Sequence, residues 1–572
     1  MGYKNDVIFL LWSSHYFKIH VRITPMKRKN IQEILVDLND RIDAITDINA
    51  KVVIKVLLNL IEHLTQELDT LEETNEKLHD EINRLKGEQG KPNVRPQADK
   101  KDISSEKDRK PKKKKKAKSK NKKNKIVINR TVKCAINQER LPDDAIFKGY
   151  QSVVIQDLDI KTDNIKFRKE VYYSPSMRKT FIAHLPKGYQ GEFGPNIKAL
   201  ILSLHSDSKM TEPAIVNFLA IHGIRISAAT VSRIITDHHE LFHQEKADIV
   251  QAGLPSTIYQ QMDDTSARVN GRNHYTHILC NEYYTAYFTR PRKDRLTVLE
   301  ILSQNLLTFC FNESAYALME QMGLPNRAIE QLRAFKIRKI MNRQEVDVLV
   351  KKIFPDPDKH HKNRHIILEA SGIVAYQRSS HAVPLLLTDD APQFKQITGM
   401  LALCWIHGGR HYKKLDPMCS RHIKKREEFV EKYWDFYHKL LNYKQSPTPV
   451  VAKKLRNEFR LFFSQKTGYD QLDERIQRTY LKADSLLFVL KYPEIPLHNN
   501  AAELGARVQA RYRDISFQTK NKKGTEAKDT FMTIVATAKK LGVNAFLYIK
   551  DRVSQQFEMP ALADLVAAHN SS

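Results

Sequence analysis

Acidic residues directly follow two predicted strands of this 572-residue chain. Asp263–Asp264 come after the strand predicted over Ser256–Met262. Asp389–Asp390 come after Val383–Leu387, an apolar run that predicts a short strand buried on both faces. Because active residues in open α/β sheets gather beyond strand ends, both pairs lie where a sheet usually carries its chemistry.

A third acid, Glu503, lies in the first turn of a predicted helix with Asn500 as its N-cap. Arg507 and Arg511 follow it by four and eight residues. Each acid also has a structural explanation: the aspartates can cap turns, and Glu503 fits the third position of a capping box with Arg507 as its ion-pair partner. Taken one at a time, these structural roles are the better explanation.

Three carboxylates gathered in one site require a different explanation. In a low dielectric they repel one another strongly, and divalent cations neutralise such clusters. Two Mg²⁺ ions about 3.5–4 Å apart activate the attacking oxygen and stabilise the leaving oxygen of a phosphodiester displacement. Asp263, Asp389 and Glu503 together therefore predict nuclease or strand-transfer chemistry.

The composition favours a polyanionic partner such as nucleic acid. Lys and Arg number 94 against 66 Asp and Glu, which leaves a formal charge of +28 and a pI near 9.6. Five scattered cysteines exclude a disulfide framework and a paired-cysteine zinc site. The apolar run Val7–Trp12 is far shorter than the ~20 residues that cross a bilayer. We therefore expect no membrane span and a reduced, cytoplasmic protein.

Apolar residues recur at alternating steps of three and four between residues 54 and 85. β-branched residues at one seam position, leucine at the other and a single asparagine are typical of a parallel two-stranded coiled coil. The alternative is an amphipathic helix packed on its own domain. We favour a dimer because a polar segment follows more than four heptads; its predicted interface residues are Ile61, Leu64, Leu68, Leu71, Asn75, Leu78, Ile82 and Leu85.

A strongly basic segment follows this helix. Lys91–Lys125 holds 17 Lys and Arg against 4 Asp and Glu. Its low hydrophobicity predicts a disordered arm that binds phosphates by counterion release, although a solvated linker or a nuclear signal has the same composition. We expect its lysine run to contact DNA: Lys112, Lys113, Lys114, Lys115 and Lys116.

Alternating segments at residues 152–160, 165–173 and 180–185 predict a small β unit. A strand hairpin is predicted later, at residues 275–280 and 283–289. Residues 300–374 and 425–490 predict mainly helical insertions, in which the aromatic cluster at residues 433–437 is core rather than a base-stacking surface.

Two short helices between these parts have helix-turn-helix spacing. They are predicted at residues 213–221 and 228–235, after an apolar helix at 198–206, and Ser227 is the N-cap of the second. Ser227, Thr230 and Arg233 then share one exposed face that could contact DNA. The same spacing is common in plain helical bundles.

These motifs together resemble the DDE transposases of the insertion sequence 66 type. The resemblance lies in Asp263-Asp264-Thr265, in Asp389 followed by Cys404-Trp405-Ile406-His407-Gly408-Gly409-Arg410, and in Asn499-Asn500-Ala501-Ala502-Glu503 with Arg507 downstream. It extends to the predicted zipper, to Phe193-Gly194-Pro195, to the helix-turn-helix and to a tail from Thr530 to Lys540, roughly residues 50–555.

The resemblance implies a ribonuclease H-like α/β catalytic core with helical insertions. It assigns Asp263, Asp389 and Glu503 as catalytic metal ligands for two Mg²⁺ or Mn²⁺ ions. His407 and Arg410 would steady a phosphate or the second acid, and we expect both, with Arg507 and Arg511, to contact DNA. The implied partners are the terminal inverted repeats of a mobile element, target DNA, a second subunit and accessory proteins, in a prokaryotic cytoplasm.

The chain departs from the family at three places. Cys134 stands alone where members usually carry a cysteine zinc-binding unit, so no structural zinc is expected. His498 replaces a common Asp, and Asp390 replaces a frequent Gly. Because Asp390 adds a second acid, the ligand in that pair stays open, and we favour the first acid of each pair.

The predicted domain order runs from an N-terminal extension to a C-terminal tail. An N-terminal extension and helix (1–50) precede the coiled coil (51–90), the basic linker (91–130) and the small β unit (131–190). The helix-turn-helix region (191–250), the catalytic domain (251–555) and the tail (556–572) follow.

Two rival functions are compatible with the sequence. His239-Glu240-Leu241-Phe242-His243 fits the HExxH pattern of zinc metalloproteases, although no clear third ligand follows. The other rival is a dimeric helix-turn-helix DNA-binding protein whose acids are structural.

Overall fold

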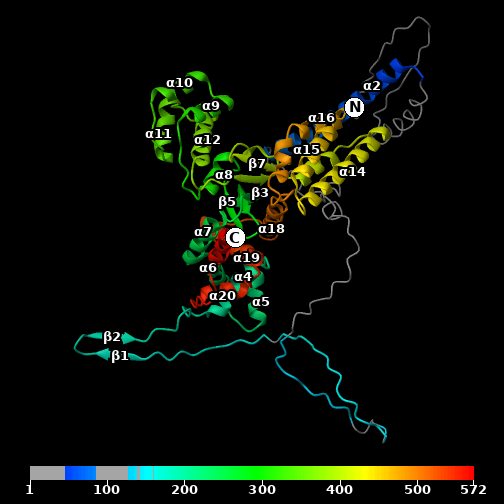
Figure 1. Ribbon diagram of the computed structural model, residues 1–572. Coiled ribbons are helices and arrows are strands. Elements are labelled where there is room, and N and C mark those ends of the chain that lie inside the picture. Colours follow the sequence, from blue (N-terminus) through cyan, green and yellow to red (C-terminus); the bar gives the residue numbers. More distant parts are fainter. Residues whose placement is uncertain (1–45, 86–126, 138–141, 143, 159, 572) are drawn as a thin grey trace, which may run out of the picture.

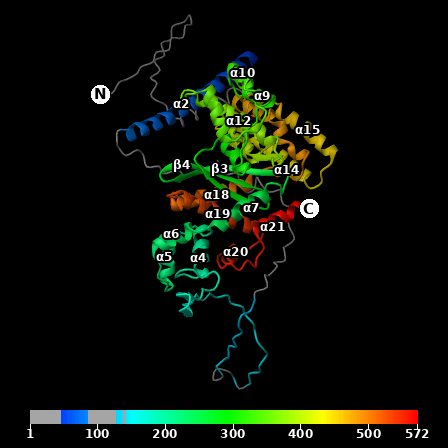
Figure 2. The same ribbon diagram turned by 90° about the vertical axis from the view of Figure 1, so that its left-hand side faces the viewer.

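The computed structural model describes residues 46–85, 127–137, 142, 144–158 and 160–571. A central sheet lies between groups of helices, and a long helix and an extended arm project from this body (Figures 1 and 2). The predicted contacts of Lys112–Lys116 lie outside the described residues. No helix in the described ranges is both long and apolar enough to cross a bilayer.

The central sheet has five strands in the order β5-β4-β3-β6-β7. β3, β4 and β5 form an antiparallel meander, to which β6 and β7 add in parallel with β3. The protein is therefore a mixed α/β protein. The strands are β3 (Tyr259–Val269), β4 (Arg272–Cys280), β5 (Thr285–Arg290), β6 (Leu385–Thr388) and β7 (Met400–Leu403).

The expectation that the first strand ends at Met262 was wrong. β3 continues to Val269, because β4 pairs with it from Gln261 to Val269. Its parallel pairing with β6 stops much earlier, at Gln261 opposite Leu387. Asp263–Asp264 consequently lie inside a strand, at the point where one of its two neighbours ends.

Two long helices, α18 (Asn500–Ser516) and α19 (Lys522–Lys540), lie against the meander (Figure 2). α19 covers the edge strand β5. The backbone N–H groups of Thr285 and Tyr287 donate to the hydroxyls of Thr537 (3.3 Å) and Thr533 (3.1 Å). Side chains of α19 thus satisfy donors that an open sheet edge would expose.

The helix-turn-helix region forms as predicted from the sequence. It consists of α4 (Pro195–Ser206), α5 (Glu212–Ile221) and α6 (Ala228–Thr236), followed by α7 (Glu240–Gly253). Ser227 caps α6 by accepting a hydrogen bond from the N–H of Thr230 (3.1 Å). The three helices share a small core of Ile201, Ile215, Leu219, Val231 and Ile235.

Both predicted insertions are helical. The aromatic side chains at residues 433–437 of the second insertion are buried, as expected for core. The helices of the two insertions, of the segments beside them and of the C-terminal region are α8 (Arg295–Leu302), α9 (Glu313–Gln321), α10 (Asn326–Ala334), α11 (Arg343–Ile353), α12 (His361–Gln377), α13 (Trp405–Lys413), α14 (Ser420–Tyr443), α15 (Pro449–Phe463), α16 (Asp470–Tyr480), α17 (Ala483–Leu486), α20 (Ala545–Val553) and α21 (Leu562–Ala567). Short 3₁₀ turns complete the chain at residues 392–394, 488–490 and 568–571.

The predicted zipper is one helix, α2 (Ile48–Leu85), docked beside α14 and α16 (Figure 1). Glu62 is buried and accepts hydrogen bonds from the N–H groups of Met418 and Cys419 (both 2.9 Å) and from His422 Nδ1 (2.9 Å). Its carboxylate therefore caps the positive end of α14. Leu58 packs beside it.

This docking uses a face of α2 that flanks the heptad seam, and Ile54, at the start of the seam, packs against it. Leu58 and Glu62 occupy outer heptad positions, whereas the seam residues from Ile61 to Leu71 and Leu78 stay exposed, Leu71 by 64%. The alternative, a helix packed on its own chain, is therefore confirmed for one face of α2. Pairing of two chains along the exposed seam stays a prediction.

The arm before the helix-turn-helix differs from the predicted β unit. It has two short strands, β1 (Val171–Ser174) and β2 (Lys179–Ile182), paired as a hairpin, and residues 152–158 and 160 form no strand. Alternation sets the extended backbone, but a strand also requires a hydrogen-bonded neighbour, which this segment lacks among the described residues.

The close packing of α18 on the sheet can be tested by a substitution at Gly505. A Cβ at this position would approach Ile278 Cγ2 of β4 to 2.8 Å. We expect Gly505→Val to lower the free energy of unfolding by about 1–3 kcal/mol, because the branched Ile278 has no room to yield. Chemical denaturation measures the loss. Leu504→Val, at an exposed neighbouring position, is the control, and equal stability of both variants would contradict the tight packing.

Candidate active site

The structure places Asp263 and Asp389 on neighbouring parallel strands. Gln261 and Leu387 form the last registered pair of β3 and β6, and each aspartate lies two residues further on. Asp389 lies directly after β6, as predicted, and its carboxylate accepts a hydrogen bond from the N–H of Ala391 (3.1 Å). The two carboxylates therefore belong to one end of the sheet.

Glu503 reaches the same end of the sheet because the start of α18 is tied to both strands. The side chain of Asn499 donates to the carbonyl of Met262 (2.7 Å), next to Asp263, and its N–H donates to Cys404 Sγ (3.3 Å). Cys404 in turn donates its N–H to the carbonyl of Thr388 (3.0 Å). This chain of hydrogen bonds holds β3, β6 and α18 together.

The predicted cap of α18 was displaced by one residue. Asn499, not Asn500, is the N-cap, so Glu503 stands one position beyond the capping-box site. The side chain of Asn499 makes no cap hydrogen bond because it bonds the strand instead. The capping-box explanation for Glu503 is therefore excluded.

The charges of the three acids act on one another. Burial and the neighbouring charge of Asp389 raise the pKa of Asp263 to about 7, with a smaller contribution from Glu503. Burial also raises the pKa of Asp389. Both shifts show that negative charge is costly here without a positive partner.

The second acid of each pair is already paired with cations. Asp264 lies 3.5 Å from Lys293 Nζ and accepts a hydrogen bond from the side-chain amide of Gln393 (2.6 Å). Asp390 pairs with Lys395 (3.2 Å) and Lys482.

These contacts distinguish the two acids of each pair. Burial alone would raise the pKa of Asp390, but the two lysines outweigh it and lower that pKa. Within the described residues, neither Asp263 nor Asp389 has a Lys or Arg partner. The first acid of each pair is thus the one available to a metal ion.

Glu503 lies among the motif residues of α13. Arg410 Nη2 donates to Glu503 Oε2 (2.9 Å), and Arg507 Nη2 lies 3.9 Å from the same oxygen. Arg410 also donates to His407 Nε2 (3.2 Å), which places the ring proton on Nδ1, 3.5 Å from Glu503 Oε1. Burial lowers the pKa of His407, while the charge of Glu503 opposes that shift.

The two glycines of this motif let α13 lie close to α14. A Cβ on Gly408 would meet the hydroxyl of Tyr433 at 2.7 Å, and one on Gly409 would meet the ring of Trp434 at 2.6 Å. The buried aromatic cluster thus sets the position of His407 and Arg410.

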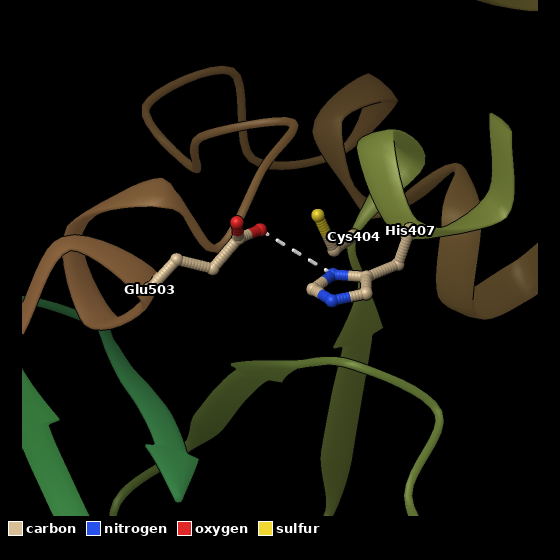
Figure 3. A group of neighbouring side chains, drawn as sticks. All are labelled: Cys404, His407 and Glu503. Carbon is tan, nitrogen blue, oxygen red and sulfur yellow. Dashed lines mark ion pairs between the residues drawn. The ribbon is translucent and has the colours of Figure 1, made fainter. Parts of the chain in front are cut away.

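Cys404, His407 and Glu503 bring possible metal-ligand atoms within 4.8 Å of one another (Figure 3). Hydrogen bonds and burial within the protein already explain the position of this group. Burial raises the pKa of the Cys404 thiol to about 11, and the thiol accepts the N–H of Asn499. Cys404 thus supports the start of α18, whereas Glu503 is hydrogen-bonded by Arg410 and lies 3.5 Å from His407 Nδ1.

The aspartate side of the site fits a hard cation. Carboxylate and carbonyl oxygens are the donors that Mg²⁺ prefers. The side-chain oxygens of Asn499 and Gln261 are buried without a hydrogen-bond partner among the described residues, and Gln261 shares its strand face with Asp263. Glu503 is paired with Arg410, however, and no three carboxylates of the described residues bring their oxygen atoms within 4.8 Å of one another.

The HExxH residues do not form a metal site. His239 is buried, and its Nε2 is bonded to the backbone carbonyls of Ile234 (2.9 Å) and Ile235 (3.1 Å). His243 Nδ1 is bonded to the hydroxyl of Thr530 (2.8 Å). Both rings pack α7 in the protein interior, which removes the basis for a zinc protease.

The predicted DNA-contact residues remain accessible in part. Ser227 and Arg233 are exposed on α6, and Arg233 donates to the hydroxyl of the half-buried Thr230 (3.2 Å). Arg507 and Arg511 are exposed along α18. No ligand identifies a contact for any of them.

Sequence reasoning missed the lysines that pair with the second acids. Lys293, Lys395 and Lys482 lie in loops or at helix ends, without a motif around them. The role of Asn499 had a signal, the paired asparagine, but its target on β3 was not predictable.

A protein of Sinorhizobium fredii described as uncharacterized protein y4jO is 32% identical to this chain over 323 residues, which cover 99% of that protein and 56% of this chain. This chain belongs to the same family. No protein-family model matches the chain. The relative's description adds no activity, so the chemistry must be argued from the site itself.

Mg²⁺ and Asp263→Asn provide a test of the ligand assignment. Without metal, we expect the substitution to raise the melting temperature by roughly 2–4 °C, because it removes a buried charge beside Asp389. Mg²⁺ should raise the melting temperature of the wild type by mass action, and that rise should be lost in the variant. Differential scanning calorimetry measures both effects.

Asp390→Asn is the matched control, since its carboxylate is held by two lysines. It should lower the melting temperature and keep the response to Mg²⁺. Equal responses in the two variants would contradict the assignment of Asp263.

Proposed function

We propose that this protein is a DNA transposase of the DDE type that cuts and joins phosphodiester bonds with the help of Mg²⁺. The observation that carries the proposal is the meeting of Asp263, Asp389 and Glu503 at one end of the sheet, in a chain of formal charge +28. An acidic site in a basic protein suits a phosphodiester substrate, because cations neutralise the acids and the basic surface attracts the DNA.

The fold supports this proposal. An antiparallel meander of three strands extended by two parallel strands is compatible with the ribonuclease H-like core that the sequence resemblance implies. Each acid lies on an element that this sheet positions: β3, the end of β6, and a helix packed across β3 and β4.

Asp263 and Asp389 would hold the metal ions, with Glu503 completing the ligand set. Bound Mg²⁺ would activate the attacking oxygen, of water or of a 3′-OH, and stabilise the leaving oxygen. Arg410 and His407 of α13 contact Glu503 and orient its carboxylate. For Glu503 to join the aspartates, its carboxylate must exchange Arg410 for the cation, which leaves that guanidinium free to face a DNA phosphate.

DNA binding would use the helix-turn-helix and the basic surfaces around it. Arg225 is exposed in the turn, and Arg233 is exposed on the second helix, α6. A helix-turn-helix commonly places its second helix in the major groove. We assign it the terminal repeats, with the lysine run at residues 112–116 as a nonspecific contact.

Pairing of two subunits would use the exposed seam of α2. The buried outer face of this helix is occupied by its own chain, so the open apolar face is left for a second copy. Asn75 is exposed on the seam, where paired asparagines fix the register of a two-stranded coil.

Cleavage of DNA carrying the inverted repeats that flank this reading frame tests the proposal. We expect Asp263→Ala, Asp389→Ala and Glu503→Ala each to reduce the rate of Mg²⁺-dependent cleavage more than about 100-fold. Substitution of a residue that only contacts a metal ligand typically causes a smaller loss. Binding to the same DNA should persist. Gel-based cleavage and mobility-shift assays measure the two properties, with Asp390→Asn as the control that keeps cleavage.

Unchanged cleavage in all three alanine variants would reject the catalytic proposal. Binding without cleavage in the wild type would favour the alternative, a dimeric helix-turn-helix DNA-binding protein.

The seam of α2 can be tested by the double substitution Leu64→Lys and Leu71→Lys. We expect it to convert the dimer to a monomer in sedimentation velocity, because buried lysines repel across a two-stranded seam. Thr70→Lys, exposed off the seam, should stay dimeric. An unchanged mass in the double variant would place the subunit interface elsewhere.

A further inference from the structure

The chain makes a strained turn where α18 ends. Phe517 has φ +55° and ψ −55°, and the N–H of Gln518 donates to the carbonyl of Ser516 (2.6 Å) across it. This is a γ-turn with a positive φ at its central residue, the form of γ-turn that is rare and strained. A bulky aromatic residue at positive φ is a genuine outlier, and such strain persists only where the surrounding structure imposes it.

The β3–β4 hairpin imposes this conformation. The N–H of Gly271 donates to the side chain of Gln518 (2.6 Å), and the N–H of Asn270 donates to the carbonyl of Thr519 (2.8 Å). Thr519 returns a hydrogen bond from its N–H to the carbonyl of Arg268 (3.1 Å). The backbone on the C-terminal side of Phe517 is thus fixed to the sheet.

The strain is not offset by burial of the ring. The side chain of Phe517 is 75% exposed. Residues 266–274 and 511–523 together hold one carboxylate, Asp514, and six exposed cations, Arg268, Arg272, Arg511, Lys520, Lys522 and Lys523. A further cation, Arg513, is mostly buried and pairs with Ser266 and Asp514. An exposed aromatic ring among cations is the combination that single-stranded nucleic acid binds.

This basic platform, defined as Phe517 with those six exposed cations, lies between the two parts assigned to DNA. Glu503 is 14 residues earlier on the same helix, about 21 Å away at 1.5 Å per residue. On the other side, a Cβ at Gly524 of α19 would lie 3.7 Å from Thr236 Cγ2, at the end of α6. Exposed Arg507 and Arg511 connect the platform to the acids along α18.

We propose that the platform binds an unpaired stretch of DNA beside the cleavage site, with a base stacked on Phe517 and the phosphates on the surrounding cations. The proposal rests on the proposed function for the identity of the nucleic acid. The base must be unpaired because neighbouring pairs cover the faces of bases inside a duplex. Phenylalanine has no hydrogen-bonding group, so the stacking is tolerant of sequence.

The test is the affinity of the full chain for a fluorescein-labelled 20-mer of dT and for a duplex of the same length, measured by anisotropy without metal at one salt concentration. We expect Phe517→Ala to weaken binding to the single strand about tenfold, since stacking on one base accounts for roughly 5- to 150-fold by alanine substitution. Duplex affinity should change less than about twofold. Phe517→Trp should keep both, and Phe335→Ala, at an exposed phenylalanine of the insertion, should change neither.

A second variant separates stacking from a structural role. Phe517→Gly relieves the positive φ, so we expect a higher melting temperature together with the same loss of single-strand binding. Unchanged single-strand affinity in Phe517→Ala, or an equal loss for both DNAs, would overturn the proposal. A changed sedimentation coefficient in Phe517→Ala with unchanged DNA affinity would assign the ring to a protein contact instead.

The catalytic proposal is tested independently, because binding is measured without metal. Loss of cleavage in the triad variants alongside unchanged binding in Phe517→Ala would therefore reject the platform alone.

Discussion

The constraint on which the site depends is the meeting of like charges in a half-buried place. Asp263 and Asp389 end up beside each other because β3 and β6 are parallel neighbours, and burial together with the charge of Asp389 raises the pKa of Asp263. The protein tolerates this cost through a network that ties the three elements together, from Thr388 through Cys404 and Asn499 to Met262. Without that network, repulsion would push the elements apart. With it, the acids stay together, and in the proposed function bound cations would offset their repulsion.

The surrounding charges then sort the acids. Lysines pair with the second aspartate of each pair, and Arg410 pairs with Glu503. Among the described residues, Asp263 and Asp389 therefore lack a Lys or Arg partner, whereas Glu503 is paired with Arg410. The exposed Phe517 turn lies at the other end of the helix that carries Glu503. One helix thus connects the acid site with a surface suited to nucleic acid.

Much of the secondary structure was predictable, because local signals decide it. The zipper helix, the Ser227 cap and both helical insertions follow from periodicity and capping residues. The errors arose where a distant partner decides the outcome. β3 extends past Met262 because β4 pairs with it, and the alternating segment at residues 152–160 fails to form a strand for want of a neighbour. In the site, residue type and order suggested the three acids, whereas the lysines beside Asp264 and Asp390 carried no local signal. Their positions depend on how loops pack.

The buried Glu62 has a further geometric consequence. It fastens α2 to the start of α14, and α14 packs on α13, the helix that carries His407 and Arg410. In an assembly paired along α2, the separation of the two acid sites would be set by this rigid route through α14. In the proposed function, this route would also fix the stagger between the two cuts.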